Sequence, residues 1–460
     1  MLTFFIKAKI LLYNGDMKKL ILCALSILFF SPALRAEPDG EILTIPANPK
    51  KGFNWGYALY LPTTINSAKT LPMLLIMGNT GRIANAEETE KTILRHLPYQ
   101  SSEGPVAKSL GVPLVMPMVP RQEDFYTHAL SRAVMVSKDK NFKRLDLQVL
   151  NIIKDARKQL KKRGIKTEKK VLVTGFSAAG VFAWRWTMLH PEYVLATVTG
   201  GALYHMLPVE ELNGEKLIYP VGVGDFEELT GKKFNKKAWS KIPILSTNGE
   251  KDDNDTFVYK ECFDPDEERI VLEKVLPGKN VFERRAQSIQ LLHKLAPNVQ
   301  TYLYPWLAHQ PVSGDVAAFL KKHINGGPLK PFTPTDTSNR KPGQVHIVNV
   351  FWGKDMNIPE EYKDLFASVE PDDLILQTDV DYPYWLYREY GKIDILHKDK
   401  KVTQADRSYS VTVDGKSIIG YKLSPMDWGL LRAKKDRTFT LRSQKPEFFE
   451  IPKKLTFTIQ

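Results

Sequence analysis

Short apolar runs alternate with stretches of helical spacing from about residue 41 to residue 325. The runs predict strands at residues 42–46, 55–61, 73–77, 112–118, 170–174, 195–199, 242–247 and 301–304. The first two are polar or alternating enough for an antiparallel edge, whereas the later ones are nearly continuous, as in strands buried on both faces. Helical spacing predicts helices at 145–160, 181–188, 284–295 and 316–324. This order predicts an α/β fold with a mostly parallel sheet covered by helices.

Residues 203–241 form a longer mixed stretch between two of these strands. A connection of this length is either a lid over the site or a surface excursion with its own short helices. The pattern leaves both interpretations open.

The hydrophobic pattern changes after residue 325. Residues 326–344 are rich in proline and glycine and predict a linker between two domains. Further strands are predicted at 345–351, 373–378, 384–387, 408–413, 417–421, 438–442 and 455–459, with a hairpin turn at 413–416 (VDGK). We therefore expect a catalytic domain over residues 37–325 and a smaller β-rich, sandwich-like accessory domain over residues 345–460.

Aromatic residues of this second domain are candidates for contact with a carbohydrate or another polymer. Trp385, Tyr387 and Trp428 occur in or near its predicted strands. Aromatic side chains in strands more often fill the core, so packing is the alternative interpretation.

The first 36 residues have the pattern of a signal peptide. Lys18 and Lys19 precede the apolar run 20–30 (LILCALSILFF), and cleavage is expected after Ala36. Met17 stands directly before this pattern and is an alternative start. Residues after 36 contain no apolar run long enough to span a membrane. We expect a secreted or periplasmic protein, in which Cys262 is the remaining cysteine and no disulfide forms within the chain.

The chain is basic, with a formal net charge of +13. A basic surface favours anionic partners in general. The lysines and arginines are spread along the chain and accompany no nucleic-acid motif, so no nucleic-acid partner is expected.

Residues 169–182 combine an apolar strand, a Gly-x-Ser turn and a helix around Ser177. A serine that projects from a sharp strand-to-helix turn sits in strained backbone, and the turn closes only between small residues. Gly175 and Ala179 are those residues, although the Gly-x-Ser motif usually has glycine at the position of Ala179. Gly180 allows the helix to approach the strand closely. Ser177 is therefore the predicted nucleophile.

Such a serine needs a general base and an acid that orients the base. In α/β-hydrolases, which the serine turn at 175–180 resembles, the acid and then the histidine follow the serine, each on a loop after a later strand. His309 follows the strand at 301–304 and is the predicted base, while His128 precedes the serine in the chain. Asp252 is the first aspartate after the strand at 242–247 and is the preferred acid, with Asp253 and Asp255 as alternatives.

The acidic turn at 248–255 (NGEKDDND) also allows an interpretation as a calcium loop. It lacks the glycine that an EF-hand requires. The calcium loop is therefore the less favoured interpretation of this turn.

An oxyanion hole requires two backbone N–H groups aimed at the developing charge. Ala178 is expected to supply one, and Gly78 or Asn79, after the strand at 73–77, the other. Candidate substrate-pocket residues are Phe125, Tyr126, Phe176 and Trp306.

Residues 41–325 resemble the α/β-hydrolase superfamily, in particular secreted esterases of the polyhydroxybutyrate-depolymerase and feruloyl-esterase kind. The matching pieces are the turn at 175–180 (GFSAAG), the helix that ends in His190-Pro191, the turn at 249–252 (GEKD) and the loop with Ala308 and His309. The resemblance implies a serine hydrolase that cleaves small-molecule or polymeric carboxylic esters through an acyl-enzyme, with neither a metal nor an organic cofactor. A peptidase of the prolyl-oligopeptidase-like type and a non-catalytic binding protein on a hydrolase scaffold are the alternatives.

Overall fold

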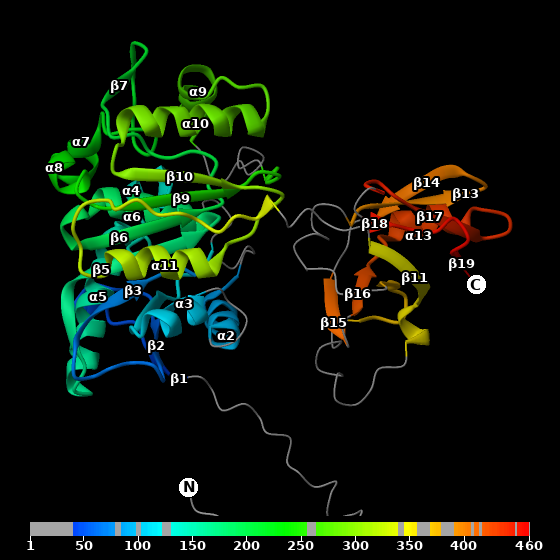
Figure 1. Cartoon of the computed structure of the whole chain (residues 1–460), viewed down its shortest axis with the longest axis horizontal. Helices are drawn as coiled ribbons and strands as arrows, with labels where there is room; N and C mark the ends of the chain where they lie inside the picture. Colours follow the sequence, from blue (N-terminus) through cyan, green and yellow to red (C-terminus); the bar gives the residue numbers. More distant parts are fainter. Residues whose placement is uncertain are drawn as a thin grey trace, which may run out of the picture.

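The first domain is built on one eight-stranded sheet in the order β1-β2-β4-β3-β5-β6-β9-β10 (Figure 1). The computed structural model describes residues 40–78, 84–97, 103–121, 130–254, 264–338, 345–356, 369–378, 391–405, 409–413, 416–446 and 449–459. The strands are β1 (Gly40–Ile45), β2 (Tyr57–Pro62), β3 (Thr70–Leu75), β4 (Leu114–Pro117), β5 (Lys166–Phe176), β6 (Val194–Gly200), β9 (Ile244–Gly249) and β10 (Val299–Tyr304). Each overlaps one of the eight strands predicted for this part of the chain.

Strand direction places the carboxyl ends of the central strands at one edge. β2 runs antiparallel to both β1 and β4, and all other neighbouring pairs are parallel. The prediction of a mostly parallel sheet with an antiparallel edge is confirmed, and this strand order is that of the α/β-hydrolase fold. In open α/β sheets, sites form in the loops beyond the carboxyl ends of the strands.

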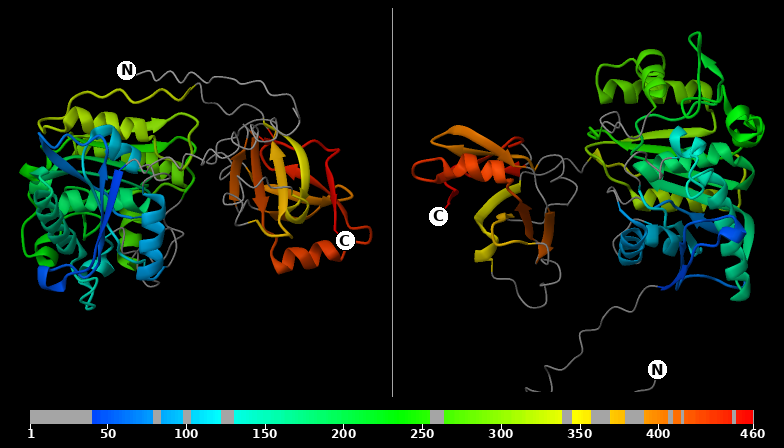
Figure 2. Two further views of the ribbon diagram at one scale, coloured as in Figure 1. Left: turned by 90° about the horizontal axis from the view of Figure 1, so that it is seen from below. Right: turned by 180° about the vertical axis from the view of Figure 1, so that it is seen from behind.

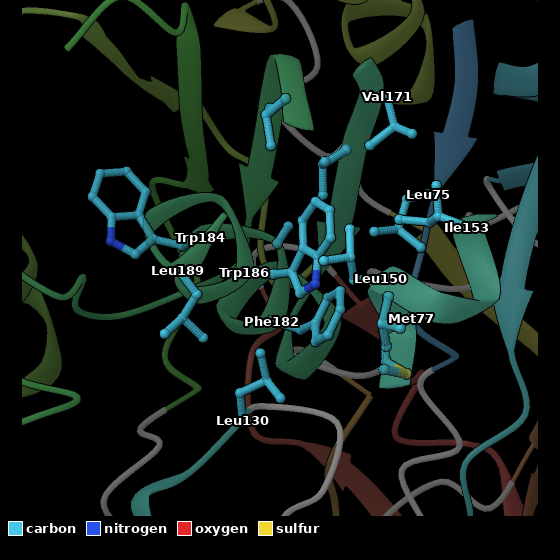
Figure 3. Close-up of a cluster of buried hydrophobic side chains, with 14 of the residues drawn as sticks. Leu75, Met77, Leu130, Leu150, Ile153, Val171, Phe182, Trp184, Trp186 and Leu189 are labelled. Carbon is cyan, nitrogen blue, oxygen red and sulfur yellow. The ribbon is translucent and has the colours of Figure 1, made fainter. Parts of the chain in front are cut away.

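Helices cover both faces of the sheet (Figures 1 and 2). One face carries α5 (Leu145–Lys162), α6 (Ala178–Leu189) and α10 (Val281–Leu295). The other carries α2 (Ala86–His96), α3 (Glu103–Leu110) and α11 (Ser313–His323). In Figure 3 the side chains of Phe182 and Trp186 on α6 lie among those of Leu75, Met77 and Leu150. The helix that follows Ser177 is therefore anchored in the core.

The hydrophobic pattern did not predict α2 and α3. A capping box starts α2, because the Asn85 side chain accepts from the backbone N–H of Glu88 and the Glu88 side chain accepts from that of Asn85. A capping box starts a helix whatever its apolar pattern, and Ile93 of α2 is then buried in the core cluster.

Residues 203–241 are an excursion packed into the domain. They contain a short hairpin, β7 (Glu211–Leu212) with β8 (Glu215–Lys216), and the short helices α7 (Phe226–Thr230) and α8 (Lys236–Trp239). Leu203, Met206 and Tyr219 are buried in the core clusters. The stretch therefore has short helices of its own and packs into the core, and its role as a lid stays a prediction.

The second domain has two sheets that share one core. The first has the order β15-β16-β12-β11-β18 and the second the order β14-β13-β17-β19. Their strands are β11 (Val345–Trp352), β12 (Leu374–Thr378), β13 (Ile393–His397), β14 (Lys400–Ala405), β15 (Tyr409–Val413), β16 (Lys416–Tyr421), β17 (Thr438–Ser443), β18 (Phe449–Glu450) and β19 (Thr456–Thr458), with helix α13 (Pro425–Arg432). Residues of both sheets form a single buried cluster, which agrees with the predicted sandwich-like domain.

Trp428 belongs to the packing of this second domain. Its ring stacks on that of Trp352 with centroids 5.4 Å apart, and Trp352 donates from Nε1 to the carbonyl of Thr458. Trp385 and Tyr387 lie outside the described residues. Contact with a polymer through this domain stays a prediction.

Within the described ranges, no helix is both long and apolar enough to cross a membrane. The predicted signal peptide at residues 1–36 and Cys262 lie outside these ranges.

Candidate active site

Ser177 occupies the turn between β5, which ends at Phe176, and α6, which begins at Ala178. Its backbone has φ 60° and ψ −128°, a conformation that residues other than glycine rarely adopt. The Ser177 N–H donates to the carbonyl of Gly200 at 2.8 Å, and its carbonyl accepts from Val181 at 3.0 Å. These bonds and the buried helix hold the serine in strained backbone at the carboxyl edge of the sheet, as the motif predicts.

The small residues around Ser177 are required by close backbone contacts. A Cβ on Gly175 would lie 2.1 Å from the carbonyl oxygen of Ala179, and a Cβ on Gly180 would lie 2.5 Å from that of Gly200. Ala179 itself is buried, and its methyl group belongs to the core cluster. Alanine thus fits where glycine is commoner, while positions 175 and 180 have no room for a side chain.

His309 and Asp252 form a buried hydrogen-bonded pair. Nδ1 of His309 lies 2.9 Å from Oδ2 of Asp252, and Oδ1 of Asp252 accepts from the Asn254 N–H at 3.0 Å. Asp253 is exposed, and Asp255 lies outside the described residues. Among the described aspartates of this turn, Asp252 is therefore the one bonded to His309.

The His309 ring lies beside the serine turn. Its centroid is 4.7 Å from that of Phe176, the residue before Ser177. A Cβ on Gly201 would come within 2.7 Å of the Phe176 ring and 3.0 Å of His309 Cε1, so a side chain there would displace both rings. The tertiary structure thus brings together the serine turn and the histidine that the sequence separates.

We call residues 248–254 the acid turn and residues 305–312, between β10 and α11, the histidine loop. The two are in direct backbone contact. A Cβ on Gly249 would lie 2.2 Å from the carbonyl oxygens of both Leu307 and Ala308. Glu250 donates from its N–H to Tyr304 at 2.9 Å, and Lys251 donates to Leu307 at 2.8 Å. These contacts give Asp252 and His309 a common backbone support.

Arg285, on α10, adds a buried cation under the acid turn, and sequence reasoning missed it. Its guanidinium donates to the carbonyl of Gly249 at 3.2 Å and to the carbonyl of Asp252. Burial lowers the pKa of Arg285, and the negative charges of Asp252 and Asp253 act in the opposite direction. The only sequence signal was its place in a predicted helix, and an arginine there suggests an exposed face.

Two candidate backbone donors to an oxyanion follow the carboxyl ends of neighbouring strands, β5 and β3. Ala178 is the first residue of α6, so its N–H has no carbonyl acceptor within the helix. Gly78 is buried and follows β3, which pairs with β5. Asn79, the alternative to Gly78, lies outside the described residues.

The predicted pocket residues separate into two groups. Phe125 and Tyr126 lie outside the described residues, as does His128. The Phe176 ring packs against the His309 ring, with centroids 4.7 Å apart. Trp306 has φ 62°, donates from its N–H to Glu250 Oε2 at 3.2 Å, and has the Lys251 ammonium 4.9 Å from its ring centroid. It therefore joins the acid turn to the histidine loop.

His190 of the family-like His190-Pro191 pair has a structural position. Its Nε2 lies 3.0 Å from Oδ2 of Asp146, a buried carboxylate that also accepts two bonds from Arg144. The contact between His190 and Asp146 joins the end of α6 to the start of α5. His190 therefore lies at the opposite end of α6 from Ser177.

A cavity of about 930 Å³ lies away from these residues. Lys170, Val194 and Ile242 line it: Lys170 lies in the amino-terminal half of β5, Val194 begins β6, and Ile242 stands two residues before β9. Ser177 and Asp252 follow the carboxyl ends of β5 and β9, at the opposite edge of the sheet. As for metals, the described residues contain no group of three or more His, Cys, Asp or Glu side chains placed to hold an ion.

Comparison with known proteins gives matches to solved structures only. The chain matches no family model and no curated protein. It is similar to the poly(3-hydroxybutyrate) depolymerase LpqC from Bordetella parapertussis, with 14% identity, a TM-score of 0.40 and coverage of 62% of this chain and 88% of that one. It is also similar to poly(aspartic acid) hydrolase-1 from Sphingomonas sp. KT-1, with 16% identity, a TM-score of 0.40 and coverage of 62% and 98%. An S-formylglutathione hydrolase from Agrobacterium tumefaciens matches with 13% identity, a TM-score of 0.34 and coverage of 63% and 94%.

Proposed function

We propose that the protein is a serine hydrolase that cleaves carboxylic esters through an acyl-enzyme. Ser177 is the nucleophile, His309 the general base and Asp252 the acid that orients it. The observation that carries the proposal is the 2.9 Å contact between His309 Nδ1 and Asp252 Oδ2 on a ring that packs beside the strained serine turn.

The chemistry follows from the orientation of the imidazole. With Nδ1 donating to Asp252, the lone pair of Nε2 is the one that can accept the Ser177 hydroxyl proton. Ser177 Oγ then bonds to the acyl carbon, and the carbonyl electrons move to its oxygen. The amides of Ala178 and of Gly78 or Asn79 are the proposed donors to this oxyanion. When the tetrahedral intermediate collapses, the C–O bond to the alcohol breaks and His309 protonates the leaving oxygen.

The second half of the cycle uses water in place of the serine. His309 takes a proton from water, the hydroxide oxygen bonds to the acyl carbon, and the carboxylic acid leaves as His309 returns the proton to Ser177 Oγ. The cycle consumes one water and one ester and yields an acid and an alcohol, so it requires no cofactor.

A fluorophosphonate probe together with paired substrates tests the proposal. The full-length protein is labelled and assayed on p-nitrophenyl acetate and butyrate and on aminoacyl p-nitroanilides. The variants are Ser177→Ala and, as a matched control, Ser240→Ala, which removes an exposed hydroxyl directly after α8. We expect an adduct on Ser177 in the wild-type protein and in Ser240→Ala, and no adduct or ester turnover in Ser177→Ala.

Two outcomes would contradict the proposal. Ester turnover that survives Ser177→Ala would remove Ser177 as the nucleophile. Turnover of the anilides but not of the esters would show that the protein is a peptidase and not an esterase.

A further inference from the structure

The two ends of the histidine loop are tied to each other. Tyr304, the last residue of β10, donates from its hydroxyl to Oδ2 of Asp315, in the first turn of α11, at 2.6 Å. Both side chains are buried. Burial, followed by the bond to Asp315, raises the pKa of Tyr304, so its hydroxyl stays protonated and remains a donor. The loop with His309 therefore begins and ends at one buried hydrogen bond.

A segment that composition assigns to the linker lies along this part of the fold. We call residues 329–337 the strap. Phe332 accepts from Gln300 Nε2 at 2.5 Å and donates to Gln300 Oε1 at 3.2 Å, so the strap pairs with a side chain of β10. The Phe332 ring packs edge-on against Phe319 of α11, with centroids 5.5 Å apart. The strap thus bridges the strand and the helix that flank the histidine loop.

Two threonines attach the strap to the two ends of the loop. Thr335 donates from its N–H to Oδ2 and from its hydroxyl to Oδ1 of Asp315, both at 2.7 Å. Thr337 donates from its hydroxyl to the carbonyl of Pro305 at 2.7 Å, and its side chain is fully buried. Each end of the histidine loop therefore has one threonine of the strap bonded to it.

We infer that Thr335, Thr337 and Asp315 are positioning residues for His309, and that the strap supports the histidine loop through the hydrogen bonds of these two threonines. This inference rests on the proposed role of His309 as the base. Proton transfer requires the imidazole within hydrogen-bond reach of the serine, and a misplacement of about 1 Å costs on the order of 100-fold in rate. Pro305 is four positions before His309, so a shift of its carbonyl moves the start of the loop.

The test uses full-length variants of nearly equal shape. Thr337→Val keeps the volume and removes the donor, Thr337→Ser restores the hydroxyl, and Thr333→Val changes an exposed threonine of the same strap as a control. We expect Thr337→Val to lower kcat on a soluble p-nitrophenyl ester by about 10- to 100-fold with little change in KM. Thr337→Ser should recover most of this loss, and Thr333→Val should match the wild type.

Several results would overturn the inference. Wild-type kcat in Thr337→Val would do so, and so would a loss that Thr337→Ser does not recover, since the hydroxyl would then not be the cause. If Thr337→Val does not fold, Thr335→Val decides, because that residue is exposed and loses only its bond to Asp315 Oδ1. A kcat below that of the wild type supports the inference, and an unchanged kcat overturns it. Failure of the proposed function is distinguishable, because Ser177→Ala would then keep its turnover.

Discussion

Nδ1 of His309 lies 2.9 Å from Oδ2 of Asp252, and both side chains are buried. A carboxylate in this place selects the imidazole tautomer that has its other nitrogen unprotonated. It also stabilises the imidazolium that forms when the base takes a proton. Substitution of Asp252 should therefore affect activity, whereas substitution of its exposed neighbour Asp253 should not.

Replacement of Asp252 by asparagine should remove most of the activity without loss of the fold. The amide can hold the opposite tautomer, in which Nε2 carries the proton, so we expect kcat to fall by about 10,000-fold. Asp253→Asn is the matched control, because Asp253 is the next residue and is exposed. Initial rates on a p-nitrophenyl ester measure both. Equal losses in the two variants would contradict the assignment of the acid to Asp252.

Replacement of Arg285 by methionine should lower both stability and turnover. The guanidinium donates to the carbonyls of Gly249 and Asp252, and hydrogen bonds to a charged donor contribute about 1.5–3 kcal/mol. We expect a loss of at least about 2 kcal/mol in urea unfolding, together with a lower kcat, because the backbone of Asp252 loses its support.

Arg269→Met is the control for this variant. Arg269 pairs with Glu215 on an exposed surface, and its replacement should change neither quantity beyond error. An Arg285→Met protein as stable and active as the wild type would show that the acid turn needs no support from α10.

Substitution of Gly175 by alanine should prevent folding or strongly destabilise the protein. The new Cβ would lie 2.1 Å from the carbonyl oxygen of Ala179 and 2.8 Å from the backbone nitrogen of Gly180, and these backbone atoms cannot rotate away as the end of a side chain could. We expect a loss of at least about 3 kcal/mol, measured by thermal unfolding. Gly314→Ala is the control, since a Cβ there meets nothing within 4 Å. A soluble Gly175→Ala protein with the wild-type midpoint would contradict the close approach of β5 and α6.

The pH dependence of stability should contain a contribution from Asp146. Burial acts to raise the pKa of this carboxyl, but hydrogen bonds from Arg144 and His190 and the charges of the same residues outweigh it and lower the pKa to about 2. Because the folded pKa is below the ordinary value near 4, the contribution of roughly 2 kcal/mol is present above about pH 4 and is lost as the pH falls toward 2.

Asp146→Asn tests this contribution. The variant should be less stable than the wild type at pH 7, and the difference in urea unfolding should shrink between about pH 4 and pH 3. A difference that stays constant over this range would show that the carboxylate charge contributes nothing.

Much of the fold could be predicted because its signals are local. All of β6 and residues 171–174 of β5 are buried, and short apolar runs between polar or turn residues are typical of strands covered on both faces. By contrast, β13 (IDILH) and β14 (KKVTQA) went unpredicted, because β13 is a short run interrupted by Asp394 and β14 has exposed lysines and a weak apolar pattern. Among the described strands, β14 pairs with β13 alone, across the turn at Lys398 and Asp399, so pairing rather than an apolar pattern forms this edge strand.

The sequence by itself determined the serine turn, since Gly175, Ser177 and Gly180 are close neighbours and the need for small residues arises within one turn and the adjacent strand. It also determined that an acidic turn and a histidine would follow later strands. The tertiary structure decided which aspartate is buried against His309, that Arg285 lies under the acid turn, and that residues 329–337 bond to the histidine loop. The physical reason is the same in each case. Burial and hydrogen-bond partners come from segments distant in the chain, so adjacent residues such as Asp252 and Asp253 differ only once the chain has folded.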